Sequence, residues 1–102
     1  MFGDLLGNME EKQKAMREEL AEITVEAEAG NGAVKVKANA NREILNISID
    51  RDALDWDDVE QVEDLIVVAV NEALGKAAER EAVESQRLLK DMLPPGLGGM
   101  FG

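Results

Sequence analysis

The sequence ITVEAEAGNGAVKVKA, residues 23–38, decides the fold. Apolar and polar residues alternate on both sides of Asn31-Gly32, and a period of two is typical of a β-strand with one buried face. Asn-Gly is a strong hairpin signal, because both of its residues tolerate a positive φ. Folding the chain on this turn places Glu28 opposite Lys35 and gathers the aliphatic side chains on the other face. A slip of one residue would destroy both arrangements, so the sequence predicts one hairpin register.

A third strand is expected after the hairpin. The chain turns back through Asn41-Arg42 into another alternating segment. Its predicted antiparallel register places these aliphatic pairs on one face: Val34 with Ile49, Val36 with Ile47, and Ala38 with Leu45. A three-stranded meander leaves that face uncovered, so a further element has to bury it.

Helices are predicted on both sides of the meander. Residues 8–22 form the first, with Asn8 and Glu11 as a capping-box type start. The second runs from about residue 58 to residue 92, with Asp57 and Glu60 at its N-terminus. Its buried face is expected to hold Val59, Val62, Ile66, Ala69, Val70, Ala73 and Ala77. The predicted fold class is α+β: a helix, a three-stranded antiparallel meander and a long C-terminal helix.

The second helix is too long for the sheet. Thirty-five residues span ~52 Å at ~1.5 Å per residue, whereas a compact domain of this size has a radius of gyration near ~13 Å. Beyond residue 77 the apolar stripe narrows to a seam, which resembles a narrow stripe on the first helix. We therefore expect the two helices to pair antiparallel as an arm that projects from the sheet.

An elongated chain of this kind has a small core, which favours a homodimer that buries more of the sheet. The candidate dimerisation residues are Val34, Val36, Leu45 and Ile47. We expect a single domain over residues 1–93. Residues 94–102 are expected to be a flexible Pro/Gly-rich tail, because its prolines and glycines stop a helix.

The composition excludes several classes of function. The chain has 22 Asp and Glu against 11 Lys and Arg, a net charge of −11, and no Cys, His or Tyr. Thiol and imidazole chemistry, zinc sites of the usual type and disulfides are therefore excluded. We expect no enzyme activity, no cofactor and no metal. No apolar run approaches the ~20 residues that cross a bilayer, so we expect a cytoplasmic protein that makes no membrane contact.

The acidic side chains are concentrated in one segment. Residues 50–64 contain eight acids and one base, and contribute −7 of the total charge of −11. Their start resembles a calcium loop, but Asp55 stands where glycine is required and Gln61 where a bidentate glutamate belongs. A solvated acidic turn that caps the second helix explains them better. One alternative function is an acidic protein-interaction module or DNA mimic that acts through this surface.

The basic side chains suggest a second function. Five of them would come together near the tip of the antiparallel arm: Lys12, Lys14, Arg17, Arg87 and Lys90. Acidic residues accompany them, so the tip is about neutral and permits phosphate contact.

The order of elements, together with several short motifs, resembles the YbaB/EbfC family of small bacterial nucleoid-associated proteins. The resemblance covers nearly the whole chain. None of its motifs is a catalytic signature. They are Met1-Phe2-Gly3, Val34-Lys35-Val36, Ile49-Asp50, Glu63-Asp64-Leu65-Ile66 with Ala69 and Asn71, and Leu93-Pro94-Pro95-Gly96.

This resemblance implies a tweezer-like homodimer with projecting helical arms. It also implies binding to double-stranded DNA with little sequence specificity, and a role in nucleoid organisation and gene expression. Carried onto this chain, the DNA contacts fall on the five basic residues of the arm, with Arg80 and Lys76 ranked behind them.

Overall fold

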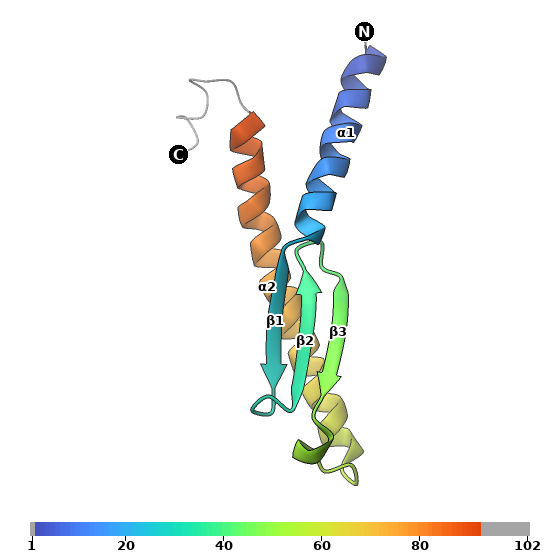
Figure 1. Cartoon of the computed structure of the whole chain (residues 1–102), viewed down its shortest axis with the longest axis vertical. Coiled ribbons are helices and arrows are strands. Elements are labelled where there is room, and N and C mark those ends of the chain that lie inside the picture. The colour runs from blue at the N-terminus through green and yellow to red at the C-terminus, as the bar shows by residue number, and fades with distance from the viewer. Residues whose placement is uncertain (1, 93–102) are drawn as a thin grey trace.

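The computed structural model describes residues 2–92 (Figure 1). Helix α1 spans Phe2–Ala21, the strands β1, β2 and β3 span Thr24–Ala29, Val34–Asn39 and Ile44–Ile49, the short 3-10 helix η1 spans Arg51–Ala53, and helix α2 spans Val59–Met92. The three strands form one antiparallel sheet in the order β1-β2-β3. The α+β class and the element order predicted from the sequence are confirmed.

The β1–β2 hairpin has the predicted register. Glu28 lies opposite Lys35, and all six residue pairs of the two strands follow from the same turn. Asn31 and Gly32 have φ values of 57° and 90°, which are the left-handed values that a tight hairpin turn of this kind requires. Within residues 2–92, no ion pair forms between the facing lysines and glutamates of β1 and β2. Packing of the aliphatic face therefore contributes more to the strand register than these charges do.

The β2–β3 pairing departs from the prediction at one position. Lys37 lies opposite Asn46 as expected, but the next residue, Ala38, lies opposite Ile44. Leu45 is therefore the extra residue of a β-bulge, and the predicted pair of Ala38 with Leu45 is wrong. Ile44 and Leu45 are both aliphatic, so the alternation of residue types could not reveal which one faces Ala38.

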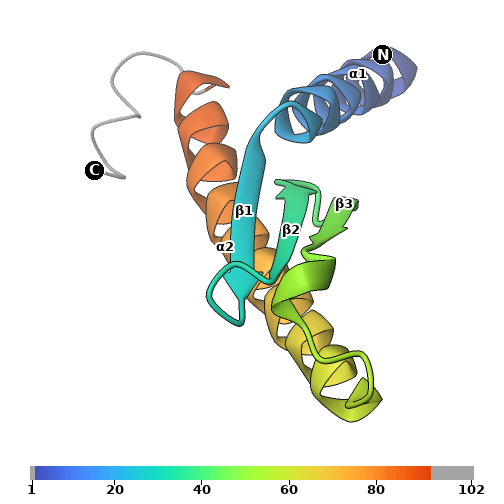
Figure 2. The ribbon, with the colours of Figure 1, turned by 60° about the horizontal axis from the view of Figure 1, so that its bottom comes forward.

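Helix α2 crosses the sheet and covers β1 and β2, leaving β3 at the uncovered edge (Figures 1 and 2). The core is built from small side chains, which let the helix approach the strands closely. Its buried cluster consists of Ala27, Ala29, Val34, Val36, Ala38, Ala69, Ala73 and Ala77. Val59 was expected on this face but is 57% exposed, because the first turn of α2 lies beyond the cover of β1 and β2.

Helix α1 begins earlier than the sequence predicted. It starts at Phe2, so Asn8 lies within the helix and does not cap it. Glycine lowers helix propensity by ~1 kcal/mol but does not forbid a helical backbone, and Gly3 and Gly7 are both accommodated. The end at Ala21 agrees with the predicted end to within one residue.

The two helices form a V and do not pair along a seam. Both project past the same end of the sheet and diverge towards their tips in both views (Figures 1 and 2). Leu20 is buried where the helices leave the sheet, whereas Met9 and Leu89 further out are 51% and 57% exposed. The predicted coiled-coil seam is therefore wrong, because the helices are already too far apart at Met9 and Leu89 for these side chains to cover each other.

The elongation of the chain matches the expectation from the length of α2. The radius of gyration is 19.0 Å and the principal extents are 64 × 30 × 17 Å, whereas a compact chain of this size would have a radius of gyration near ~13 Å. The tail predicted over residues 94–102 lies outside the described residues. Neither α1 nor α2, over residues 2–92, contains a stretch long and apolar enough to cross a membrane.

Candidate nucleic-acid interface

The five basic residues predicted for DNA contact lie on the two arms of the V. Lys12, Lys14 and Arg17 belong to α1, and Arg87 and Lys90 belong to the last turns of α2. All five are exposed. Because α1 runs towards the sheet and α2 runs away from it, the antiparallel arrangement brings both groups to the same end of the molecule (Figure 1).

The α1 cations point in different directions. Lys12 borders an open groove between the arms, together with Met9 and Met16 of α1 and Leu89 of α2. Lys14 is two residues further, which rotates it by ~200° to the outer side of the helix. Neither lysine takes part in an ion pair within the described part of the chain. Both ammonium groups are therefore available to an anionic ligand.

Arg87 is in a different electrostatic position. Its Nε donates to Glu84 Oε2 at 2.8 Å, and its other nitrogens lie 3.4 Å from Glu19 Oε1 and 3.6 Å from Asp91 Oδ2. Three carboxylates therefore surround one guanidinium. The predicted arm position of Arg87 is correct, but much of its charge is already compensated within the chain.

The same contacts shift two pKa values. The hydrogen bond from Arg87 holds the pKa of Glu84 below its ordinary value of 4.5, with the charges of Arg87 and Arg80 acting in the same direction. The hydrogen bond to Glu84 and its charge raise the pKa of Arg87. Each shift shows that the structure favours the charged form of that group.

Glu84 provides a pH test of this arrangement. A carboxyl with a depressed pKa contributes stability above its unfolded pKa and loses that contribution as the pH falls through the folded value. We expect the side-chain carboxyl carbon of Glu84 to titrate by NMR with a midpoint below 4.5, its ordinary value. Arg87→Gln should return the midpoint towards 4.5. A wild-type midpoint at or above this value would contradict the geometry.

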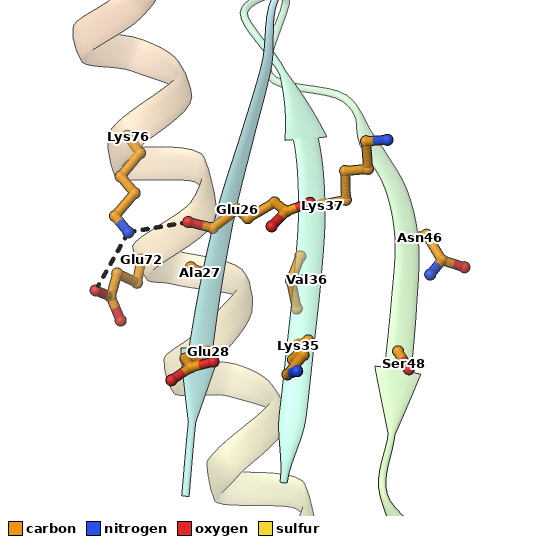
Figure 3. A pocket seen from close by; sticks show the side chains of 10 residues that line it. All are labelled: Glu26, Ala27, Glu28, Lys35, Val36, Lys37, Asn46, Ser48, Glu72 and Lys76. Carbon is orange, nitrogen blue, oxygen red and sulfur yellow. Dashed lines mark hydrogen bonds and ion pairs between the residues drawn. The ribbon is translucent and has the colours of Figure 1, made fainter. Parts of the chain in front are cut away.

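Lys76 and Arg80 are both held by neighbouring groups. Lys76 Nζ donates to the carbonyl oxygen of Glu26 at 2.9 Å and lies 3.9 Å from Glu72 Oε1 (Figure 3). Arg80 Nη2 lies 3.4 Å from Glu84 Oε1. Arg87, which was ranked ahead of them, is held by more carboxylates than either, so these contacts do not decide the ranking.

The sheet carries a separate mixed-charge depression beside Lys76 (Figure 3). Three glutamates and three lysines line it, so it has no net charge: Glu26, Glu28, Glu72, Lys35, Lys37 and Lys76. An anionic backbone would find no excess of positive charge on this surface. Lys35 lies opposite Glu28, as the sequence predicts, and the same register places Lys37 opposite Glu26.

The acidic segment 50–64 comprises the connection between β3 and α2 and the first turns of α2, at the other end of the molecule. Three of its aspartates accept hydrogen bonds from nearby backbone amides. Asp50 accepts from Asp52 at 3.1 Å, Asp55 from Asp57 at 3.0 Å, and Asp58 from Gln61 at 3.2 Å. Asp58 caps α2, one residue later than the predicted Asp57. No cluster of acidic side chains within residues 2–92 has the geometry to hold a metal ion.

The four predicted dimerisation residues fall into two groups. Val34 and Val36 are buried beneath α2, at 0% and 1% exposure. Leu45 and Ile47 of β3 are 49% and 43% exposed, and Ile44 beside them is 38% exposed. Of the four predicted residues, the two on β3 are therefore the ones that the chain leaves exposed.

Comparison with known proteins agrees with this architecture. The family model of the YbaB/EbfC DNA-binding family matches residues 2–92. A nucleoid-associated protein of Thermoanaerobacter pseudethanolicus is 47% identical over 89 residues, which cover 87% of this chain and 80% of that protein. A nucleoid-associated protein of Moorella thermoacetica is 44% identical over 101 residues, covering 89% and 97% of the two chains.

A solved structure shows the same fold. The crystal structure of an uncharacterized protein of Helicobacter pylori superimposes with a TM-score of 0.70. The match covers 86% of this chain and 92% of the other, at 22% sequence identity. At this level of identity the similarity concerns the arrangement of helices and strands.

Proposed function

This chain belongs to the YbaB/EbfC DNA-binding family, and from that premise we propose that it acts as a homodimer that holds duplex DNA with its helical arms. The contacts are made to phosphates and involve little reading of base sequence. Its place of action is the nucleoid in the cytoplasm, where it affects nucleoid organisation and gene expression.

One observation carries the proposal: exposed cations lie on two arms that project beyond the sheet. Lys12, Lys14 and Lys90 have no ion-pair partner among residues 7–91, whose side chains the structure describes, and the arms are the part of the molecule farthest from the acidic segment 50–64. Lysine binds phosphate as a point charge and carries no base-specific geometry. Such contacts support affinity for any duplex.

The separation between the acidic segment and the arm tip makes contact with a polyanion feasible. A homodimer carries twice the chain's net charge of −11. From Asp64 to Lys90 the helix rises by ~39 Å, which is about five Debye lengths at physiological salt. Repulsion from the acidic segment is therefore largely screened at the tip, where exposed lysines lie among acidic side chains and the local charge is about neutral.

The uncovered surface of β3 is the proposed dimer contact. Val34 and Val36 are already buried within the chain, so Leu45 and Ile47 supply the contact together with Ile44. A second copy would cover these aliphatic side chains, and two V-shaped pairs of arms would then extend from a shared centre.

Salt-dependent titration of a labelled duplex tests the DNA contact. We expect wild-type affinity to fall steeply with salt, because each phosphate contact that releases a counterion contributes about −0.9 to the slope of log K against log salt. Lys14→Gln should lower the affinity several-fold at low salt and reduce that slope. Arg87→Gln should have a smaller effect, since three carboxylates already compensate Arg87.

Lys35→Gln is the matched control. It removes the same charge from the neutral depression on the sheet and should leave both affinity and slope unchanged. A duplex of the same length but different sequence should bind with similar affinity. Equal losses in Lys14→Gln and Lys35→Gln, or no binding by the wild type at low salt, would contradict the proposal.

A further inference from the structure

The β2–β3 turn, residues 39–43, holds the inner end of α1. The amide of Ala40 donates to the carbonyl oxygens of Leu20 at 3.2 Å and Ile23 at 2.9 Å. Asn41 Nδ2 donates to the carbonyl oxygen of Arg17 at 2.7 Å. Leu20 and Ala40 are buried, at 3% and 0% exposure. The turn therefore fixes α1 where the helix leaves the sheet. The amide of Ala40 also supplies a hydrogen bond to the carbonyl of Leu20, one of the last four carbonyls of α1, which have no partner within the helix.

The turn is itself rigidly organised around Asn39, which is 3% exposed. Asn39 Oδ1 accepts from the amides of Asn41 at 3.0 Å and Glu43 at 3.1 Å. Asn39 Nδ2 donates to Glu43 Oε1 at 2.9 Å. The Arg42 amide closes the turn on the Asn39 carbonyl oxygen at 2.9 Å. The side-chain oxygen and nitrogen of Asn39 are thus both engaged, which gives the turn one defined shape.

Arg42 links this turn to α2. Its φ is 62°, a left-handed value that glycine and asparagine adopt more readily than a long side chain does. Arginine nevertheless occupies the position, and its Nε lies 3.1 Å from Glu81 Oε2 on α2. Both arms are therefore attached to the same short turn, α1 through backbone and amide hydrogen bonds and α2 through an ion pair.

Further out, few contacts hold the arms together. Glu19 and Arg87 approach to 3.4 Å near the inner end, but Met9 and Leu89 beyond them are about half exposed. The groove between the arms is open to solvent. The angle of the V is therefore determined at its base, where the turn is located.

We propose that the β2–β3 turn is a clamp that sets the spacing of the two arms, with Asn41 and Arg42 as positioning residues for the duplex. The clamp is a property of the protein alone. Its role in DNA binding rests on the proposed function. Neither residue needs to touch the nucleic acid, because each acts through the arm that it holds.

The distance between the two arms can be measured directly by double electron–electron resonance between two spin labels. The chain contains no cysteine, so Ala15→Cys on α1 and Gln86→Cys on α2 would accept two spin labels at exposed positions. Labelled chains diluted with an excess of unlabelled chains report the distance within one copy. We expect a single narrow distribution for the parent. Arg42→Gly and Asn41→Ala should each broaden it and shift it to longer distances.

The choice of variants separates positioning from folding. Glycine fits the left-handed backbone of residue 42, so Arg42→Gly should retain the thermal stability of the parent while losing the ion pair. Arg42→Glu should broaden the distribution, and the exchanged pair Arg42→Glu with Glu81→Arg should restore it. Arg80→Ala is the control for the distance measurement alone, because it removes an arginine whose ion pair lies within α2; it should leave the distance distribution unchanged.

Duplex affinity is measured on the same variants at fixed salt. We expect Arg42→Gly to lower it by ~2- to 5-fold, the range of an exposed ion pair, with recovery in the exchanged pair. Distance distributions that stay unchanged in Arg42→Gly and Asn41→Ala would overturn the clamp. Broadened distributions with unchanged affinity would overturn the positioning role. A parent that binds no duplex would overturn the proposed function, while the distances would still test the clamp.

Discussion

Ile47→Asp is expected to split the proposed homodimer into chains that remain folded. In the single chain Ile47 is 43% exposed on β3, so an aspartate there is solvated and costs the monomer little. In the proposed dimer the same carboxylate would be enclosed by aliphatic side chains without a partner, which is strongly unfavourable. We expect the dimer dissociation constant to rise by ~100-fold or more, measured by sedimentation across a range of protein concentrations.

Val68→Asp is the matched control for this experiment. Val68 is 54% exposed and lies on the flank of α2 away from β3, so the same change of residue and charge should leave the dimer intact. Leu45→Asp should act like Ile47→Asp. Both β3 variants should bind duplex DNA more weakly because they no longer dimerise. A single chain offers only half of the arms. A dimer that survives Ile47→Asp would exclude β3 as the contact surface.

Ala73→Leu is expected to cause the largest loss of folding stability. Ala73 is fully buried among the alanines that separate α2 from the sheet. Three additional carbon atoms cannot be placed there without moving the helix away from β1 and β2, and overpacking of this kind costs ~1–3 kcal/mol or more. We expect a loss near the upper end of that range in urea unfolding, because the neighbouring alanines have no alternative side-chain conformations that could make room.

Ala82→Leu gives the comparison for this variant. Ala82 belongs to the same helix but is exposed on the projecting arm, so leucine there should change the unfolding free energy by less than ~0.5 kcal/mol. Both variants have to be measured at one protein concentration, since association contributes to apparent stability. Equal stability of the two variants would mean that α2 does not rest tightly on the sheet.

The sequence was most informative where one residue pattern had only one structural solution. The Asn31-Gly32 turn with its alternating flanks determined the hairpin register, and the uninterrupted stretch before Pro94 determined the extent of α2. The elongated shape followed from the same helix length. In each case a local rule and the global arrangement agreed.

Prediction failed where neighbouring residues of the same type left a choice open. Ile44 and Leu45 could each face Ala38, so the bulge was not visible in the pattern. The seam on the arms was expected from spacing alone, but spacing does not determine whether two helices remain parallel. Their angle depends on the β2–β3 turn, whose hydrogen bonds connect residues that are far apart in the sequence.

The candidate site shows the same division. Sequence placed the five cations on two arms, and the structure has them at one end of the molecule. Acidic residues were expected near Arg87, but its contact with Glu19 was not foreseen, since the two residues are distant in the chain. Val34 and Val36 were indistinguishable from the β3 residues by type, and only the position of α2 shows that they are buried.

The acidic connection between β3 and α2 has a consequence for how the molecule meets a charged ligand. Residues 50–64 hold most of the net charge of each chain and lie at the end opposite the arms, which carry a much smaller negative charge. Each chain is therefore an electric dipole. A polyanion that comes near exerts a torque on it, which turns the acidic end away and the arms forward before any atoms touch.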